Sequence, residues 1–247
     1  MIDKKIKKLR AKFKDLNIDG YIVPKNDEFF SEYSQKNRLK IISNFSGSAG
    51  LAVILKKKNY LFVDGRYTLQ AEIECGKYFK IIEIPKILPK EILKKLNKKL
   101  VIGYDPQLFT SLNLKKLFGN SCNLSTIDTN LIDKIYKEKP KKHVNPFYHL
   151  DANIAGESVN NKINRLIKKI KKDKIDNIFI SAPENVAWLL NLRGRDNPYS
   201  PIPNCKIILT KNKKIYFFSC PKKINIIKKL IHINNFNFVN IIYFHQL

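Results

Sequence analysis

The sequence is poor in cysteine and has no recognisable cysteine framework. Its four cysteines are scattered singly along the chain: Cys75, Cys122, Cys205 and Cys220. This scatter lacks the close pairs that zinc sites and disulfide-rich domains use. Because disulfides belong to oxidising compartments, a reduced cytoplasm is the expected location.

Long apolar runs are also missing. No stretch approaches the roughly 20 consecutive apolar residues that a membrane-spanning helix needs, because lysine interrupts every long one. The first residues, Met1 to Lys5, have neither the apolar core nor the small-residue cleavage site of a signal peptide. We therefore expect a cytoplasmic protein that has no membrane partner.

Acidic residues are scarce, 21 against 47 lysines and arginines, so the formal net charge is +26. Such an excess attracts polyanions, and weak polyanion binding is one interpretation of this basic protein. Proteins that recognise nucleic-acid base edges favour arginine, however. The arginines of this chain are few: Arg10, Arg38, Arg66, Arg165, Arg193 and Arg195. The lysines are spread along the chain with abundant Asn and Ile, as AT-rich coding produces. We therefore favour a solvated surface and expect no specific nucleic-acid partner.

The sequence shows no recognisable catalytic motif. The histidines do not lie beside acidic residues at ligand spacing, and no His-Glu-x-x-His helix occurs; they are His143, His149, His232 and His245. The segment Gly47-Ser48-Ala49-Gly50 matches neither a Walker phosphate loop nor a dinucleotide fingerprint. A triad that assembles only in space stays open, because sequence order does not reveal it. We expect no catalytic residue and no metal ligand in this chain.

What the sequence does contain is one helix-then-strand unit that occurs twice. Apolar residues recur at steps of four and three from Ile2 to Phe13, and again from Val159 to Ile170. Each stripe precedes a short β-branched and aromatic run that is typical of a buried strand. These runs are 18–23 and 175–180, so they start 157 positions apart. The pattern predicts an internal repeat, which decides the fold class.

The parallel extends through a hairpin, a helix and a further strand. In the first copy these are strands at 51–55 and 60–63, a helix at 66–74 and a strand at 79–84. In the second copy they are strands at 206–210 and 215–218, a helix at 221–230 and a strand at 238–243. The first copy alone continues, with helices at 90–97, 111–118 and 130–136 and strands at 100–104 and near Asn123.

This order predicts an α/β protein in which a mixed sheet flanked by helices is duplicated and the second copy is incomplete. We expect a complete domain at 1–140, a linker at 141–157 and a truncated second domain at 158–247. The strand expected at 238–243 would then lack neighbours and present an apolar edge, which is an aggregation hazard.

Three segments indicate a protein family more specifically than the pattern of helices and strands does. They are Tyr21 to Tyr33; Phe45 to Gly50 together with Phe62-Val63-Asp64-Gly65-Arg66-Tyr67; and Ser181 to Asp196, which includes Trp188 and Arg193-Gly194-Arg195. Together they closely resemble the two non-catalytic, creatinase-type N-terminal domains of three-domain Xaa-Pro aminopeptidases. This is the aminopeptidase P family of the creatinase and methionine aminopeptidase superfamily. The resemblance covers essentially the whole chain, in order.

The resemblance implies domains that shape an active-site entrance and contribute to dimer contacts. The parent hydrolase would release the N-terminal residue from peptides with proline in second place. It also implies a C-terminal metallopeptidase domain in which two Asp, one His and two Glu hold two divalent metals, usually manganese. None of that domain is found in this sequence, so we expect a fragment that has no cofactor of its own and is inactive alone. A different hypothesis is a binding or regulatory module that docks on an intact aminopeptidase subunit.

Five residues are candidates for contact with substrate. Asp64 lies between a strand and a helix, where its carboxylate suits an N-cap, and capping is the favoured interpretation. The helix dipole does not stabilise the positive charge of Arg66 at the start of a helix. The N–H donors of its guanidinium suit a carboxylate or a peptide carbonyl. The resemblance implies that this Asp-Gly-Arg-Tyr motif, which ends at Tyr67, reaches the peptide cleft. Arg193 and Arg195 are expected either to contact substrate or to form salt bridges across domains.

The third segment also contains two large apolar side chains, Trp188 and Leu189. We expect both to be core residues.

Overall fold

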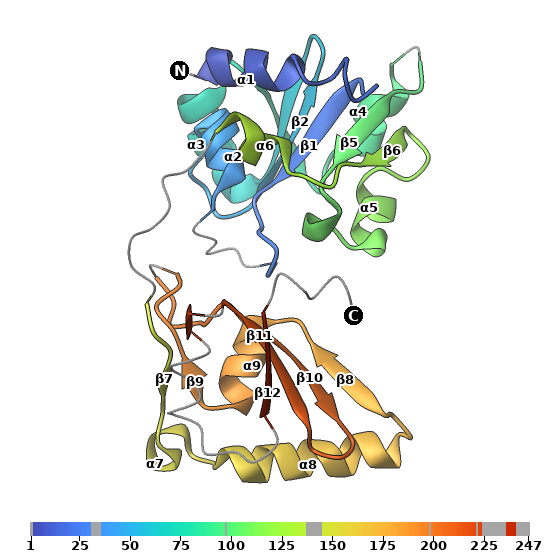
Figure 1. Ribbon diagram of the computed structural model, residues 1–247. Helices are drawn as coiled ribbons and strands as arrows, with labels where there is room; N and C mark the ends of the chain where they lie inside the picture. Colours follow the sequence, from blue (N-terminus) through green and yellow to red (C-terminus); the bar gives the residue numbers. More distant parts are fainter. Residues whose placement is uncertain are drawn as a thin grey trace. The chain divides into compact units, whose positions relative to one another are not determined.

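Figure 1 shows a computed structural model of the chain. The structure describes residues 2–30, 36–96, 98–136, 145–197, 199–220, 222–223 and 236–240. The chain divides into two compact units, which we call unit 1 (Met1–Lys139) and unit 2 (Pro140–Leu247). Over the described ranges, no helix has the length and apolar character needed to cross a bilayer.

The described part of unit 1 contains a six-stranded mixed sheet with the order β4-β3-β2-β1-β5-β6. The strands are β1 (Gly20–Pro24), β2 (Gly50–Leu55), β3 (Asn59–Asp64), β4 (Lys80–Ile84), β5 (Val101–Tyr104) and β6 (Asn123–Thr126). The helices are α1 (Ile2–Arg10), α2 (Arg38–Ser43), α3 (Thr68–Cys75), α4 (Pro89–Lys94), α5 (Ser111–Leu117) and α6 (Leu131–Ile135), with short 3-10 helices η1 (Gly65–Tyr67) and η2 (Pro106–Leu108).

Both faces of this sheet are covered at its inner strands β1, β2 and β3. Successive side chains of a strand point to opposite faces. Tyr21 and Val23 of β1 face a cluster that includes α1, α2, α3 and α6. Ile22, between them, faces the second cluster, to which α4 and α5 contribute. Figure 1 shows these two sets of helices on the two sides of the sheet. The resulting strand has a continuous apolar sequence rather than an alternating one, as a doubly covered strand requires.

A buried ion network links α2 to α6. Arg38 is 1% exposed. Its Nη2 donates to Glu28 Oε1 at 2.5 Å and to Asp133 Oδ2 at 2.9 Å, while its Nε donates to Asp133 Oδ1 at 3.1 Å. Lys36 Nζ also donates to Asp133 Oδ2, at 2.6 Å. The buried guanidinium is thereby compensated by two carboxylates, which burial of a charge demands.

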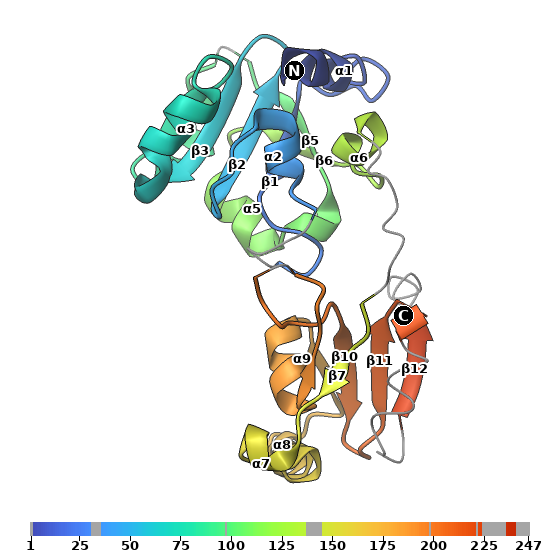
Figure 2. The same ribbon diagram turned by 90° about the vertical axis from the view of Figure 1, so that its left-hand side faces the viewer.

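Unit 2 repeats part of this topology. Its described strands are β7 (Tyr148–His149), β8 (Asn177–Ile180), β9 (Leu192–Arg193), β10 (Lys206–Thr210), β11 (Ile215–Ser219) and β12 (Phe236–Asn240); its helices are α7 (Ala152–Ala155), α8 (Val159–Lys172) and α9 (Pro183–Leu189). Four strands form a sheet in the order β12-β11-β10-β8, seen in part in Figure 2, and β7 pairs with β9. Apolar residues of α8 and α9 pack against one face of the four-stranded sheet.

The predicted α/β class, with a mixed sheet flanked by helices, is confirmed. The pairing directions repeat as well: β1-β2 and β8-β10 are antiparallel, β2-β3 and β10-β11 are antiparallel, and β3-β4 and β11-β12 are parallel. The helix predicted at 66–74 starts with the 3-10 turn η1 before α3. Of the helix expected at 221–230, all but residues 222–223 lie outside the described residues, as do 241–243 of the last expected strand.

The sequence predicts that the strand at 238–243, part of which belongs to β12, lacks a neighbour. A different strand of unit 2 has the unpaired edge. β12 lies at an edge, but so does its counterpart β4 in unit 1, so β12 has the pairing that its position requires. β8 is the strand that differs, because its counterpart β1 is central and pairs with β5 on its other side. Within the residues that the structure describes, unit 2 has no counterpart of β5 and β6.

The ion network predicts an acid-sensitive unit 1. Burial raises the pKa of Asp133, but hydrogen bonds and charge from Arg38 and Lys36 outweigh it, so the pKa lies below its ordinary value. Its stabilising contribution is therefore present above the unfolded pKa of about 3.9 and is lost as pH falls through the lower folded pKa. We expect Asp133→Asn to cost about 2–3 kcal/mol at pH 7 and to flatten the decline in stability between about pH 5 and pH 2.

Urea denaturation followed by far-UV circular dichroism at several pH values measures this effect. Fluorescence of Trp188, the single tryptophan, gives a separate signal from unit 2. Asp128→Asn, at an exposed aspartate of unit 1, is the matched control. Equal acid sensitivity of Asp133→Asn and the unsubstituted chain would contradict the assignment.

Candidate functional site

Three of the five predicted site residues lie together where β3 ends. Asp64 is the last residue of β3 and the N-cap of η1, and its Oδ1 accepts a hydrogen bond from the backbone N–H of Arg66 at 3.0 Å. The capping interpretation is thus confirmed. The same oxygen accepts from Arg66 Nε at 2.8 Å. The side chain of Arg66 is 72% exposed, so its guanidinium is at the surface.

This pair fixes the charge state and orientation of the motif. The hydrogen bond from the Arg66 side chain, followed by the one from its backbone N–H, lowers the pKa of Asp64. Asp64 is therefore ionised at neutral pH and holds one edge of the guanidinium. The Arg66 guanidinium also lies 5.4 Å from the centroid of the Tyr67 ring, a cation–π distance. An exposed arginine restrained in this way presents a positive charge in a defined direction.

Tyr67 joins η1 to the glycine-rich loop 45–50. Its hydroxyl lies 2.8 Å from Ser48 Oγ, and its ring meets Phe45 edge-on at a centroid distance of 5.9 Å. Gly47 is required for this packing, because a Cβ there would lie only 2.3 Å from the Phe45 ring. The two halves of the second sequence motif, 45–50 and 62–67, are thus one structural feature.

Sequence reasoning missed a second restraint on the same loop. Glu74 of α3 accepts from the Ser46 backbone N–H at 2.7 Å and from its hydroxyl at 2.5 Å, and Gln70 Nε2 donates to Ser46 Oγ at 2.8 Å. Burial raises the pKa of Glu74, but the bonds from Ser46 and Gln70 and the charge of Lys40 hold it below its ordinary value. The only sequence signal is the i,i+4 spacing of Gln70 and Glu74, which does not point to Ser46.

Arg193 and Arg195 belong to unit 2. Arg193 is on β9, and its Nη1 donates to the backbone carbonyls of Ala187 at 3.1 Å and Leu192 at 2.9 Å. Its guanidinium therefore has a local structural role. Arg195 follows β9 and is exposed, and its carbonyl accepts from Asn145 Nδ2 at 2.7 Å. Contact of either arginine with a substrate stays a prediction.

The prediction that Trp188 is a core residue is wrong, whereas Leu189 is buried as expected. Trp188 is 52% exposed and Leu189 is 2% exposed. Successive residues of a helix point in directions about 100° apart, and Trp188 points away from the side of α9 on which Leu189 is buried. The indole instead lies beside α8, with Lys162 Nζ at 4.5 Å and the Arg165 guanidinium at 5.8 Å from its ring. Cation–π contact explains why a tryptophan is tolerated at this half-exposed position.

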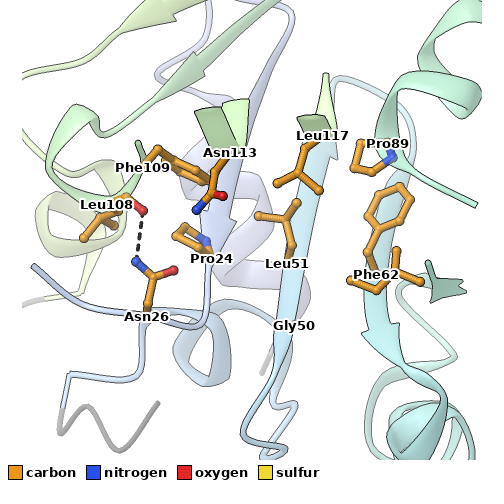
Figure 3. A pocket seen from close by; sticks show the side chains of 11 residues that line it. Pro24, Asn26, Gly50, Leu51, Phe62, Pro89, Leu108, Phe109, Asn113 and Leu117 are labelled. Atoms are coloured by element: carbon orange, nitrogen blue, oxygen red, sulfur yellow. Dashed lines mark hydrogen bonds between the residues drawn. The ribbon is translucent and has the colours of Figure 1, made fainter. Parts of the chain in front are cut away.

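Unit 1 also holds a small apolar pocket of about 150 Å³ (Figure 3). It is lined by residues from the ends of several elements: Pro24, Asn26, Gly50, Leu51, Phe62, Ile84, Pro89, Leu108, Phe109, Asn113 and Leu117. Asn26 Nδ2 donates to the Leu108 carbonyl at 2.9 Å, so this amide closes one wall. The lining contains no acid, base or nucleophile, so the pocket can hold a small apolar group but cannot perform acid–base chemistry.

In the described part of the chain, no three His, Cys, Asp or Glu side chains gather closely enough to hold a metal ion. His149 is exposed on β7, and the other three histidines lie outside the described residues.

Residues 5–135 match the model of the creatinase/prolidase N-terminal domain family, and residues 138–243 match a second model with the same description. The chain belongs to the creatinase/prolidase N-terminal domain family. The resemblance found in the sequence is thereby confirmed. The first matched region lies in unit 1, and the second lies in unit 2 except for its first two residues.

Known creatinase/prolidase relatives of this chain are longer proteins. A probable Xaa-Pro aminopeptidase P of Laccaria bicolor is 34% identical over 224 residues, covering 86% of this chain and 35% of its own length. Xaa-Pro aminopeptidase 1 of Dictyostelium discoideum is 33% identical, covering 91% of this chain and 38% of its own length. The chain thus spans about a third of the length of these curated relatives.

A solved structure matches the fold. It is an X-prolyl aminopeptidase from Caenorhabditis elegans, described as a cytosolic enzyme with a di-nuclear active site. The match has a TM-score of 0.86 at 26% identity and covers 100% of this chain and 43% of the other.

The site geometry predicts different stability effects for two neighbouring residues. Tyr67→Phe should cost about 1 kcal/mol, because it removes the hydrogen bond to Ser48 from a half-buried hydroxyl. Arg66→Ala should change the free energy of unfolding by no more than about 0.5 kcal/mol, since exposed ion pairs contribute little. Urea denaturation of each variant tests this. A larger cost for Arg66→Ala than for Tyr67→Phe would show that the arginine is structural.

Proposed function

We propose that this chain is the non-catalytic N-terminal part of an Xaa-Pro aminopeptidase, which releases the residue that precedes proline at a peptide N-terminus. In this proposal the chain has no peptidase activity alone. The observation that carries it is the pair of creatinase/prolidase N-terminal matches, which together span residues 5–135 and 138–243. The aminopeptidase relatives, of which the chain covers about a third, support it.

The proposed contribution of the chain is to bind and orient the peptide. Arg66 is the favoured contact, because its exposed guanidinium is directed by an ionised carboxylate and an aromatic ring. A guanidinium can donate to a peptide carboxylate or carbonyl. Asp64 and Tyr67 would act by positioning Arg66. Arg193 is a weaker candidate because it already donates to two backbone carbonyls, and Arg195 is exposed.

The expected metals, two divalent ions with manganese favoured, do not fit the described residues, which offer no ligand cluster. We propose that residues outside the described part of this chain supply the metal ligands in the complete enzyme. We also propose a cytoplasmic location, because the Caenorhabditis elegans relative is described as cytosolic. Dimer formation is a further part of the proposal and rests on the family resemblance.

A second candidate function, a regulatory module that docks on an intact aminopeptidase subunit, is favoured by one observation. Unit 2 has a sheet edge, that of β8, at which no described strand pairs, although the equivalent edge in unit 1 is paired. Such an edge is a template for another chain.

A chimaera tests the primary proposal. We expect a Caenorhabditis elegans enzyme whose matching N-terminal part is replaced by this chain to release the first residue of an Xaa-Pro peptide in the presence of manganese. This chain alone should release none above background. In the chimaera, Arg66→Ala should raise KM about tenfold, the loss expected for a hydrogen bond to a charged group.

Lys58→Ala is the matched control, because it removes an exposed positive charge from the turn between β2 and β3. It should leave KM unchanged. Metal-dependent release by the isolated chain would overturn its non-catalytic role. A folded chimaera no more active than the enzyme without its N-terminal part would overturn the proposed function itself.

A further inference from the structure

The apolar pocket of unit 1 lies at the carboxyl ends of strands that run in one direction. β1 and β3 are both antiparallel to β2, while β5 is parallel to β1 and β4 is parallel to β3. The lining takes Asn26 from the segment after β1, Ile84 from the end of β4 and Leu108 from η2, which follows β5. We call this cavity of about 150 Å³ the β1–β5 pocket.

The strand order makes this end of β1 a place where an α/β sheet accepts ligands. From β1 the chain adds β2, β3 and β4 on one side of the sheet, and it then returns to place β5 and β6 on the other side. Connections that leave two neighbouring strands in opposite directions open a crevice at their carboxyl ends, and ligands of α/β proteins bind in such crevices. The Asn26 side chain crosses this crevice, because its Nδ2 donates to the Leu108 carbonyl at 2.9 Å.

The β1–β5 pocket has an apolar end and an amide end, as Figure 3 shows. Leu51, Phe62 and Leu117 line the apolar end. Leu51 and Phe62 are buried in the hydrophobic cluster on this face of the sheet, and Leu117 packs against that cluster. The side-chain amides of Asn26 and Asn113 lie at the other end. The two ends therefore suit two different parts of one ligand.

The two amides have hydrogen-bonding groups to offer. In the described part of the chain, Asn26 Nδ2 donates to the carbonyls of Asp27 and Leu108, and no group donates to Asn26 Oδ1. The Asn113 backbone N–H donates to Thr110 Oγ1, while its side-chain amide has no partner among the described residues. Because Thr110 already caps α5, the helix does not need that amide. A side-chain amide has both a donor and an acceptor, so this pair can receive a polar group of a ligand.

Volume and charge restrict the ligand further. An apolar cavity of about 150 Å³ is large enough to hold one benzene ring. The described lining contains no charged side chain, so an ionised ligand would lose its hydration without gaining a charged partner. Water is a poor occupant of the apolar end, because a buried water molecule needs two or more polar partners. The pocket therefore favours a neutral molecule that is mostly apolar.

We infer that the β1–β5 pocket binds a small neutral molecule made of one aromatic ring and one carboxamide group. The ring occupies the apolar end beside Leu51 and Leu117, and the carboxamide pairs with Asn26 and Asn113. A carboxamide fits better than a hydroxyl because, like the two side chains, it has its donor and its acceptor on separate atoms. No protein side chain combines an aromatic ring with a carboxamide, so the occupant is a free molecule.

The pocket is separate from the site around Arg66. Leu51 and Phe62 belong to the hydrophobic cluster on one face of the sheet, whereas Tyr67 packs against the cluster on the other face. The inference therefore does not depend on the proposed aminopeptidase role.

Titration of the full chain with benzamide, followed by NMR of leucine and isoleucine methyl groups, tests the inference. We expect saturable shifts at Leu51, Ile84 and Leu117 with a Kd of about 1 mM, which is within the range for a ligand of this size. Leu112, which is 75% exposed on the same helix as Leu117, should not shift. Shifts that do not saturate, or that are absent from the pocket methyl groups, overturn the inference.

Two further compounds test the chemistry of the ligand. Benzoate has the shape of benzamide but carries a charge, so it should bind about tenfold more weakly. Toluene keeps the ring but lacks the amide, so it should bind about fivefold more weakly, the loss expected for a neutral hydrogen bond. Affinity of either compound equal to that of benzamide contradicts the inferred ligand.

Two pairs of variants locate the ligand within the pocket. Leu117→Phe fills the apolar end and should abolish benzamide binding, whereas Leu112→Phe, the same change at an exposed position of α5, should leave Kd unchanged. Asn113→Ala removes one amide and should weaken benzamide binding about fivefold while leaving toluene binding unchanged. Asn120→Ala, at an exposed asparagine after α5, is its matched control.

Asn113→Ala decides the test even where Leu117→Phe does not fold, because Asn113 is exposed and its loss leaves the core of unit 1 intact. Unchanged benzamide affinity in Asn113→Ala overturns the inference, as does binding that persists in a folded Leu117→Phe variant. An equal loss of toluene binding in Asn113→Ala would indicate a collapsed pocket and not a lost amide contact, and it would overturn the inference too.

Discussion

In unit 1 the central strand β1 is paired along both edges and packed on both faces, and the rest of the unit depends on this arrangement. Every residue from Gly20 to Pro24 is buried, so each backbone polar group must find a partner within the protein. β2 supplies an antiparallel partner and β5 a parallel one. Gly103 permits the close approach of β5, because a Cβ there would lie about 3 Å from Ile18 and Tyr21. The Tyr21 hydroxyl also accepts from the Leu131 N–H at 3.3 Å, which ties α6 to the strand.

The same pairing positions the candidate site. β2 and β3 form a hairpin on β1, so the loop that precedes β2 and the turn that follows β3 meet at one end of the sheet. Phe45 and Ser48 come from that loop, and Asp64, Arg66 and Tyr67 from that turn. Arg66 contacts Asp64 and Tyr67 of its own turn, and Tyr67 in turn contacts Ser48 and Phe45 of the loop. The site is therefore a property of the hairpin, because the loop that contacts Tyr67 is distant from it in sequence.

Most of the elements could be predicted because their signals are local. Apolar spacing located α1 and α8, and short β-branched runs located β1, β2, β3, β10 and β11. The repeat in turn predicted the common topology of the units. The Asp64 cap was predictable too, since capping involves residues two positions apart. The exposure of Trp188 was not, because the packing of α9 against α8 and the strands of unit 2 decides which of its side chains are buried.

The sequence by itself determined the fold class, the duplication and the residues of the Asp-Gly-Arg-Tyr motif, because periodicity and caps act over a few residues. Only the tertiary structure decided that Glu74 secures Ser46, that Tyr67 joins the loop to the turn, and that β8 rather than β12 differs from its counterpart. The physical reason is that sheet order and side-chain contacts between distant segments depend on which edges and faces come together. That choice is made by the whole chain at once, and no local pattern records it.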